Sequence, residues 1–303
     1  MNAPAKRFGM QRPPGKDRPY RGRLAPSPTG LLHLGHGRTF WTAQQRARAS
    51  AGDLVLRVED LDHARCKPEF AEAILEDLRW FGFKWQEGPD VGGPFAPYLQ
   101  RQRTQLYRHA LQKLQAGGFV YPCTCSRQDV LRALQAPHAR DDEPIYPGTC
   151  RPSAPGRAKD LSSHEIPAVP PSKKANWRFR VPDGQTISFL DGNYGPQQFV
   201  AGKDFGDFVV WRHDDIPAYQ LAVVVDDAAM QITEVVRGED LLGSTARQLL
   251  LYEALGLLPP RFFHCPLVTD QSGLRLAKRH NALSLRALRA AGKEPEDLRK
   301  EWT

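Results

Sequence analysis

Apolar residues recur along this chain with two different periods, which predict strands and helices in alternation. Residues 21–25 are predicted to form a short strand that ends at Pro26, a helix is predicted to run to Ala49, and residues 53–58 are predicted to form a buried strand. Strand, helix and strand in this order predict a βαβ unit and therefore a parallel sheet. Apolar positions three or four residues apart predict two further helices, one opened by Pro68 and one over about 102–116.

The pattern changes in the middle of the chain, from residue 119 to about residue 176. This stretch has clustered cysteines, many prolines and few apolar runs, so we expect an inserted subdomain in which 137–175 is largely loop. Apolar and polar residues then alternate over 177–181 and again at Ile187 and Phe189, which predicts antiparallel strands.

Beyond Asp207 the α/β pattern returns. Strands are predicted at 208–211 and 232–236, and Ser244 and Ser284 are candidate N-caps of two helices. The whole order predicts an α/β fold, a doubly wound Rossmann-type parallel sheet that is split by an insertion and followed by a short helical C-terminal part.

Charge and composition narrow the class of protein without deciding its function. The chain has 42 Lys and Arg against 34 Asp and Glu, a net charge of +8, which favours a polyanionic partner such as nucleic acid. A basic but otherwise ordinary enzyme explains the charge equally well. No apolar run approaches the ~20 residues of a membrane span, and residues 1–20 lack the apolar core of a secretory signal. We therefore expect a cytoplasmic protein with no membrane partner and a basic, disordered extension over residues 1–20.

Two histidines follow the first predicted strand, in the sequence His33-Leu34-Gly35-His36. Their spacing puts both imidazoles on one side of a helical turn, and a helix N-terminus favours anions through its free N–H groups. The pattern therefore indicates a phosphate site, in which Gly35 lets a base or ribose approach the backbone. Taken alone, two surface histidines on an ordinary helix are the simpler interpretation, and a metal site lacks a nearby carboxylate.

A cluster of cysteines indicates a metal site in the insertion. The chain has five cysteines, an odd number that argues against a disulfide framework. Cys123 and Cys125, with Cys150 further on, form three quarters of a zinc site. Three unrelated buried cysteines are the alternative. A fourth ligand is required, and the nearby candidates are His138, Asp141, Asp142 and His164.

Five segments stand in a fixed order along the chain. They are Arg23-Leu-Ala-Pro-Ser-Pro-Thr-Gly30 with His33–His36, Leu56-Arg-Val-Glu-Asp-Leu-Asp62, Tyr219-Gln-Leu-Ala-Val-Val-Val-Asp-Asp227, Val236-Arg-Gly-Glu-Asp-Leu241 and Arg275-Leu-Ala-Lys-Arg279. Together they resemble class I aminoacyl-tRNA synthetases of the glutamyl/glutaminyl group, over about residues 21–285. In this resemblance His33–His36 is the HIGH-type motif and 275–279 is the KMSKS-type loop.

The amino acid that such a site activates can be argued from charge. Glutamate carries two carboxylates and one ammonium, so a desolvated pocket needs about two cationic partners and one anionic partner. In the resemblance, Arg23 and Arg237 match arginines that contact glutamate. Glu59 matches the residue that takes the ammonium, and Tyr219 matches a hydroxyl donor. The expected glutamate-binding residues are Arg23, Leu24, Ala25, Pro26, Ser27, Glu59, Tyr219 and Arg237.

The resemblance also implies an ATP site, with Mg²⁺ on the pyrophosphate. The KMSKS-type loop departs from the family pattern, because Arg275 replaces its first lysine and Ala277 its serine, while Lys278 keeps the second lysine. His33, His36 and Lys278 are expected to be catalytic, since they would stabilise the charge that develops on phosphate. The expected ATP-binding residues are His33, Gly35, His36 and Lys278.

The same resemblance completes the cysteine cluster. The string Ile145-Tyr-Pro-Gly-Thr-Cys-Arg151 is similar to a C-x-C…Y-x3-C arrangement in which a tyrosine oxygen ligates zinc. One structural zinc ion would hold an insertion that is too small to bury a core of its own. The expected ligands are Cys123, Cys125, Tyr146 and Cys150.

The length of the chain selects a branch of the family. Full glutamyl-tRNA synthetases continue into a helical anticodon-binding domain, whereas this sequence ends about 25 residues after Lys278. It resembles the truncated glutamyl-queuosine branch, which implies ATP-dependent activation of L-glutamate without tRNA and transfer of glutamate to the queuosine base at the wobble position of tRNA(Asp). A monomer is expected. The alternatives are charging of a tRNA 3′ end, adenylylation of another carboxylate, and a non-catalytic tRNA-binding module.

The expected organisation follows from these patterns. It is an extension over 1–20, the first half of a Rossmann catalytic domain over 21–118, an insertion with the zinc site over 119–195, the second half of the Rossmann domain over 196–265, and the KMSKS-type loop with a helical segment over 266–303, without an anticodon-binding domain.

Overall fold

A computed structural model of the chain describes residues 18–133, 145–153, 175–268, 284–300 and 302. It opens with the predicted βαβ unit, formed by β1 (Arg21–Leu24), α1 (Leu34–Ala49) and β2 (Asp53–Leu56). β1 and β2 pair in parallel. Tyr20, which the sequence assigns to the extension, is buried, and its hydroxyl donates to Glu234 Oε2 at 2.9 Å.

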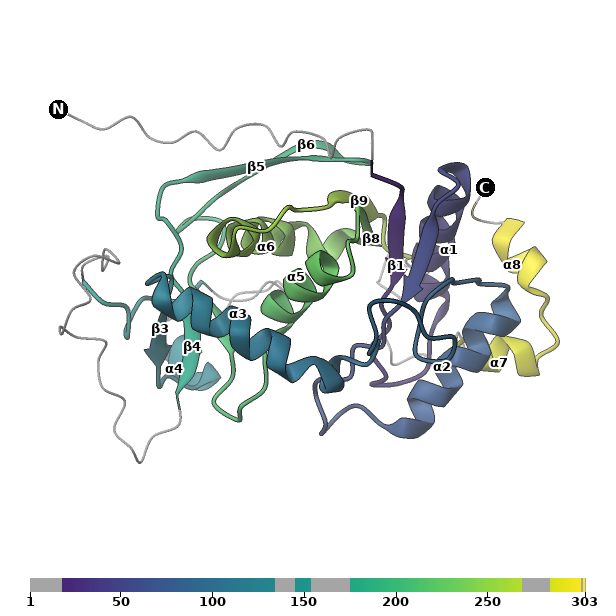
Figure 1. Cartoon of the computed structure of the whole chain (residues 1–303), viewed down its shortest axis with the longest axis horizontal. Coiled ribbons are helices and arrows are strands. Elements are labelled where there is room, and N and C mark those ends of the chain that lie inside the picture. The colour runs from purple at the N-terminus through teal and green to yellow at the C-terminus, as the bar shows by residue number, and fades with distance from the viewer. Residues whose placement is uncertain (1–17, 134–144, 154–174, 269–283, 301, 303) are drawn as a thin grey trace.

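A second parallel pair of strands lies beside the first. β8 (Glu234–Gly238) pairs with β9 (Arg261–Cys265) in parallel, and β1 lies along β8. Figure 1 shows α1 next to β1, with α5 (Tyr219–Ala229) and α6 (Leu242–Leu255) toward the other side of β8 and β9. Parallel strands flanked by helices confirm the predicted α/β, Rossmann-type fold.

A hairpin from the middle of the chain extends the second sheet. β5 (Thr186–Asp191) and β6 (Gly195–Val200) pair antiparallel, and β5 joins β9 in parallel through Asp191 and Phe262. The strand order is β6-β5-β9-β8. The proposed domain boundary at 195/196 falls within β6, inside this hairpin, and stays a prediction.

A small antiparallel sheet joins the cysteine-rich insertion to the following part of the chain. Its strands are β3 (Val120–Cys123) and β4 (Asn176–Phe179) of the insertion and β7 (Phe208–Trp211) from beyond it, in the order β3-β4-β7. The short helix α4 (Arg127–Ala133) follows β3. Most of the predicted loop over 137–175 lies outside the described residues.

The remaining helices flank these sheets. α2 is Pro68–Phe81, and α3 (Thr104–Ala116) follows a 3₁₀ turn over Gln100–Arg103. α7 (Leu285–Ala290) and α8 (Pro295–Lys300) lie at the end of the molecule that carries α2.

One of the two predicted helix caps is confirmed and the other is wrong. Ser284 caps α7, because its Oγ accepts the N–H of Ala287 at 3.2 Å. Ser244 lies inside α6, which begins at Leu242 directly after a 3₁₀ turn, and its hydroxyl instead accepts from Gln220 Nε2 at 3.1 Å. The preceding 3₁₀ turn already supplies the entry into the helix, so no side-chain cap is needed there.

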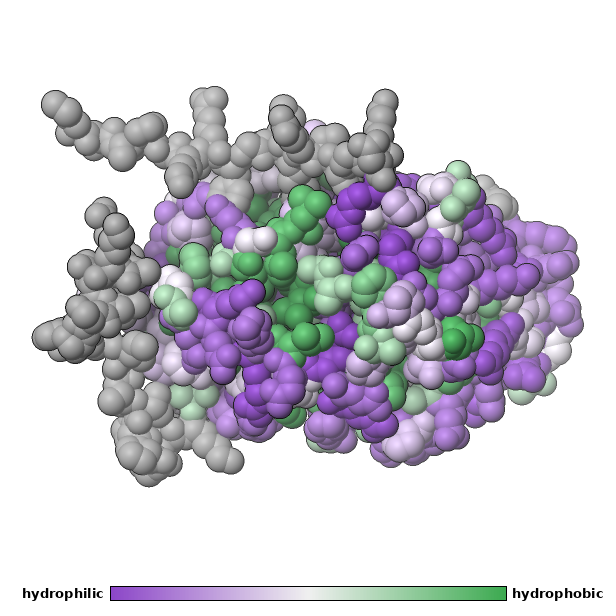
Figure 2. All heavy atoms as spheres, in the orientation of Figure 1, coloured by the Kyte–Doolittle hydropathy of each residue, from purple (hydrophilic) through white to green (hydrophobic). Residues whose placement is uncertain are grey.

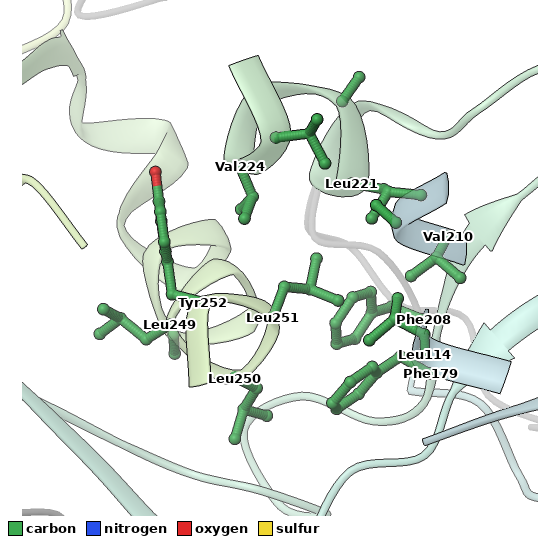
Figure 3. Packing of buried hydrophobic residues seen from close by; sticks show 14 of the residues in the cluster. Leu114, Phe179, Phe208, Val210, Leu221, Val224, Leu249, Leu250, Leu251 and Tyr252 are labelled. Carbon is green, nitrogen blue, oxygen red and sulfur yellow. The ribbon is translucent and has the colours of Figure 1, made fainter. Parts of the chain in front are cut away.

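Apolar side chains gather in two main cores. The larger lies between α3, α5, α6 and the strands β4 and β7, and Figure 3 shows Leu251 and Leu221 converging there with Phe208 and Phe179. The smaller joins α1, β1, β2, α2 and α7. On the face in Figure 2, hydrophobic residues gather over the middle of the molecule, and hydrophilic residues dominate the end with α2, α7 and α8. Among the described helices, none combines the length and apolar character that a bilayer crossing requires.

A buried carboxylate stands out between α2 and α7. Asp77 is fully buried, and neither carboxylate oxygen has a hydrogen-bond partner among the described residues. Arg286 Nε lies 3.9 Å from Asp77 Oδ1. Burial raises the pKa of Asp77 to about 6.

Replacing Asp77 by Asn is expected to stabilise the protein at neutral pH and to have little effect in acid. The pKa of Asp77 in the folded state lies above its ordinary value of 3.8, so the folded protein keeps the carboxyl proton at a pH where the unfolded chain has lost it. Folding stability is therefore lost as pH rises through about 6. The difference between the two pKa values corresponds to a loss of about 3 kcal/mol in the free energy of unfolding at neutral pH. Thermal unfolding between about pH 4 and pH 7 measures this effect. Glu72→Gln, an exposed change on the same helix, is the control. Equal melting temperatures for wild type and Asp77→Asn at neutral pH would contradict the prediction.

Candidate active site

A pocket of ≈ 250 Å³ opens where the carboxyl ends of β1 and β8 meet the N-terminus of α1. Parallel α/β sheets place ligands at this position. Backbone hydrogen bonds hold the loop after β1, since the Arg57 N–H donates to Leu24 O and the Glu59 N–H donates to Pro26 O, both at 2.9 Å. The predicted site residues that line the pocket are Arg23, Ala25, Pro26, Ser27, His33, Gly35, His36, Glu59, Tyr219 and Arg237.

The two histidines form the N-terminal cap of α1. His33 Nδ1 accepts the Gly35 N–H at 3.1 Å, and the His33 N–H donates to His36 Nδ1 at 3.3 Å. Because each Nδ1 accepts a hydrogen bond, each neutral imidazole carries its proton on Nε2 and can donate from there. A Cβ at position 35 would lie 3.0 Å from the His33 ring, closer than most such contacts, so Gly35 favours this packing.

A network of buried charges lies behind Arg23 and Glu59, which line the pocket. Arg57 is fully buried, and it donates from Nη1 to Asp227 Oδ1 at 2.7 Å and from Nη2 to Glu59 Oε1 at 3.0 Å. Arg23 Nε lies 3.6 Å from the same Asp227 oxygen. Burial raises the pKa of Glu59 although Arg57 and Arg23 oppose this. The side chains of Arg23 and Glu59 are thereby held beside each other at the strand ends.

A second buried carboxylate anchors α5, the helix that begins with Tyr219. Asp226 accepts from Arg103 Nε at 2.6 Å and from both Gln100 Nε2 and Tyr107 Oη at 2.8 Å. These bonds tie α5 to α3 and the preceding turn. The Tyr219 side chain is 38 % exposed and faces the pocket from the first turn of α5.

Arg237 reaches the pocket from β8 on the other side. Its Nη1 donates to Gln248 Oε1 at 2.9 Å, its Nη2 to Thr245 Oγ1 at 2.6 Å and its Nε to His264 Nε2 at 3.1 Å. The residue is buried, and this burial lowers its pKa. Bonds from all three nitrogens hold the guanidinium in one orientation.

Among the predicted site residues that the structure describes, Leu24 does not line the pocket. Leu24 is fully buried in the smaller core, so its predicted contact with substrate stays a prediction. Lys278, together with Arg275 and Ala277 of the KMSKS-type loop, lies outside the described residues.

The cysteine cluster has the geometry of a metal site. The Sγ atoms of Cys123, Cys125 and Cys150 all lie within 4.8 Å of one another, and the Cys125–Cys150 distance is 3.6 Å. The Tyr146 hydroxyl lies 3.4 Å from Cys123 Sγ and 3.5 Å from Cys125 Sγ. Sulfur ligands of a tetrahedral zinc ion, at Zn–S ≈ 2.3 Å, stand about 3.8 Å apart. The donor set therefore fits a metal ion, and these four predicted ligands are brought together.

Neighbouring groups modify the acidity of this cluster. Burial opposes ionisation of Cys150, but hydrogen bonds from the Thr124 backbone and from Tyr146 outweigh it and lower its pKa to about 7. Arg178 donates from Nε to Cys123 Sγ at 3.3 Å, and its guanidinium lies 4.0 Å from the centre of the Tyr146 ring. The lowered pKa favours the thiolate form of Cys150, whereas burial raises the pKa of Cys125 to about 11.

Residues 20–301 match the family described as tRNA synthetases class I (E and Q), catalytic domain. The chain belongs to this family. It is therefore an ATP-dependent ligase of the class I synthetase type, as the five segments predict.

Two relatives of this synthetase carry the name Glutamyl-Q tRNA(Asp) synthetase. The relative from Symbiobacterium thermophilum is 51% identical, over 91% of this chain and 83% of its own length. The relative from Nitratidesulfovibrio vulgaris is 49% identical, over 90% and 82% respectively. A crystal structure of the glutamate-tRNA synthetase from Elizabethkingia anophelis has a TM-score of 0.74 at 32% identity and covers 86% of this chain. The chain spans about half of that protein, 53% of its length.

Several residues of the synthetase site were not recognised from the sequence. Arg57, Asp226 and Asp227 lie inside family segments, yet sequence reasoning gave them no role. The available signal was the pair of aspartates at the end of an otherwise apolar helix, where burial without partners would be costly. His264 stands in no segment, and nothing in the sequence pointed to it.

A wider cleft leads away from the synthetase pocket. It has a volume of ≈ 1020 Å³ and runs from Glu59 and Tyr219 to Cys125 at the metal cluster. Arg65 and Arg212 line it, and both pair with Asp62, at 2.8 and 3.4 Å. The pocket and the metal cluster thus open onto one shared surface.

Proposed function

We propose that this synthetase activates L-glutamate with ATP, without tRNA, and then transfers glutamate to the queuosine base at the wobble position of tRNA(Asp). Relatives of that name match more than four fifths of both chains at about half identity, which supports this branch of the family. The proposed acceptor is a tRNA(Asp) that carries queuosine.

The observation that carries the proposal is the charge arrangement of the pocket. Arg23 on β1 and Arg237 on β8 line the pocket, and Glu59, which follows β2, lines it too. Two cations and one anion match the two carboxylates and one ammonium of glutamate. Each of the three side chains is itself held by buried partners, so the pocket is preorganised for that pattern of charges.

The chemistry follows from the position of the histidines. The α-carboxylate of glutamate attacks the α-phosphorus of ATP, and pyrophosphate leaves. His33 and His36 present Nε2 donors at the positive end of α1, where they would stabilise the phosphate charge that grows in the transition state. Mg²⁺ would accompany the pyrophosphate as part of the ATP substrate. Lys278 is proposed to contribute from the KMSKS-type loop.

The wider cleft is the proposed entrance for the acceptor. It opens beside Glu59 and Tyr219, so a nucleoside lying there would reach the activated carbonyl. A net charge of +8 would support phosphate contacts with the anticodon stem, and binding should weaken steeply with salt. A role in tRNA binding for residues 1–20, a monomeric state and a cytoplasmic location remain predictions.

Glutamate-dependent ATP–pyrophosphate exchange without tRNA tests the first step. Labelling of tRNA(Asp) with and without queuosine then tests the second. Exchange that requires tRNA, or labelling that ignores queuosine and disappears when the 3′ adenosine is oxidised, would favour charging of a tRNA 3′ end instead. Glutamate-tRNA ligases at 44% identity, such as that of Nitrosococcus oceani, make this the second candidate.

We also propose that the metal cluster holds one structural Zn²⁺ through Cys123, Cys125, Tyr146 and Cys150. The described residues around the cysteines form a small apolar cluster of their own, so a metal ion would supply stability that burial does not.

Replacing Cys150 by Ser is expected to remove most of the bound zinc and to lower the melting temperature by roughly 5 °C or more. Elemental analysis of purified protein gives the stoichiometry, and calorimetry gives the melting temperature. Cys66→Ser, a half-buried thiol outside the cluster, is the control and should keep one zinc per chain. Wild-type protein without zinc, or an unchanged zinc content in Cys150→Ser, would refute the assignment.

A further inference from the structure

Three buried polar side chains on neighbouring strands form a hydrogen-bonded series that ends at the pocket. Asp191 closes β5, His264 lies on β9, and Arg237 lies beside His264 on β8, where the two are paired in register. Asp191 Oδ2 is 2.6 Å from His264 Nδ1, and His264 Nε2 is 3.1 Å from Arg237 Nε. The His264 and Asp191 side chains are both fully buried.

The direction of each hydrogen bond in this line is determined. A guanidinium can only donate, so His264 Nε2 presents its lone pair to Arg237, and the Thr245 hydroxyl, 3.2 Å from the same nitrogen, can also donate to it. The imidazole proton then sits on Nδ1, where the Asp191 carboxylate accepts it. Burial lowers the pKa of His264, although Asp191 opposes this, and the neutral ring agrees with that assignment.

We propose that Asp191 is a positioning residue for the amino-acid pocket: it selects the His264 tautomer that holds the Arg237 guanidinium toward the substrate carboxylate. This inference rests on the proposed function, in which Arg237 binds glutamate. Neither Asp191 nor His264 lines the pocket, so both act through Arg237.

Asn at position 191 would reverse this selection. The second oxygen of Asp191, Oδ1, accepts backbone N–H groups from Asn193 at 3.0 Å, Tyr194 at 2.9 Å and His264 at 3.3 Å. An Asn side chain would keep its oxygen at this position and turn its NH₂ toward His264 Nδ1. The imidazole would then carry its proton on Nε2, so that one donor would face another at Arg237.

The test compares Asp191→Asn with Asn193→Ala in glutamate-dependent pyrophosphate exchange. Asn193 donates from Nδ2 to His264 O at 3.0 Å, so its removal loosens the same hairpin without touching the imidazole. Asp191→Asn is expected to raise KM for glutamate about 10- to 100-fold, with little change in KM for ATP. Asn193→Ala should leave KM for glutamate near wild type.

Nitrogen-15 NMR of the histidine rings provides a readout that needs no substrate. The wild type should show the Nδ1–H tautomer at His264, assigned by comparison with His264→Gln, and Asp191→Asn should show the Nε2–H tautomer. A wild-type Nε2–H tautomer overturns the inference even if the variant does not fold. An unchanged KM in Asp191→Asn, or an equal rise in Asn193→Ala, also overturns it. No glutamate-dependent exchange in wild type would instead refute the proposed function and leave the tautomer assignment standing.

Discussion

Replacing Arg57 by Met is expected to lower the free energy of unfolding by about 3–5 kcal/mol. Arg57 is fully buried and neutralises charges on several elements, with ion pairs to Asp227 at 2.7 Å, Glu59 at 3.0 Å and Asp226 at 3.7 Å. Methionine fills most of the same volume but removes the cation that the three carboxylates share, and only the more distant Arg23 and the Arg103 ion pair with Asp226 remain. Urea denaturation followed by circular dichroism measures the loss.

Arg65→Met is the matched control for this prediction. Arg65 lies in the same region of the sequence and pairs with Asp62 at 2.8 Å, but its side chain is 72 % exposed. Exposed ion pairs contribute about 0–1 kcal/mol, so this variant should remain close to wild type. If Arg57→Met also lost less than about 1 kcal/mol, the buried charges would not stabilise the pocket as inferred here.

Replacing Arg237 by Met is expected to reduce kcat/KM for glutamate in pyrophosphate exchange by roughly 10²- to 10³-fold. The proposed substrate carboxylate would lose its cation in a pocket where water does not replace it. Steady-state exchange at varied glutamate measures the effect, and thermal unfolding checks that the variant is folded.

The control for this second variant comes from the neighbouring strand. Arg261→Met removes a guanidinium from β9 that is 52 % exposed and lies 3.9 Å from Glu234. Its kcat/KM should stay within about threefold of wild type, as for a surface substitution. If Arg237→Met lowered kcat/KM for glutamate by less than tenfold, this result would argue against glutamate binding at this arginine.

The sequence predicted the fold class and many of the described residues that line the pocket, but it did not predict the buried residues that hold those side chains in place. The resemblance of the segments to the synthetase family grouped Arg23, Glu59, Tyr219 and Arg237, and the position of Glu59 after a strand agrees with where parallel sheets place ligands. The residues that hold these side chains depend on which helix packs where. Arg57 meets its partner 170 residues further on, and no local pattern encodes that pairing.

Secondary structure was missed where packing overrides local pattern. Leu221 to Val225 is apolar at every position because α5 is buried on all sides, which hides the helical period. β6 is a largely polar edge strand that pairs only with β5, so it lacks the alternation of a half-buried strand. β9 is short and central, and its burial comes from neighbours on both sides.

The strand order has a consequence for the time at which the pocket can form. Asp191 and His264 are 73 residues apart, and Arg57 and Asp227 are 170 apart, so the pocket depends on contacts of long sequence separation. Such contacts slow folding. At roughly 5–20 residues per second of synthesis, Arg57 is made on the order of ten seconds or more before Asp227. The first βαβ unit therefore emerges with an arginine that has only the neighbouring Glu59 as a carboxylate partner, and the buried charge network is completed when the second half of the chain arrives.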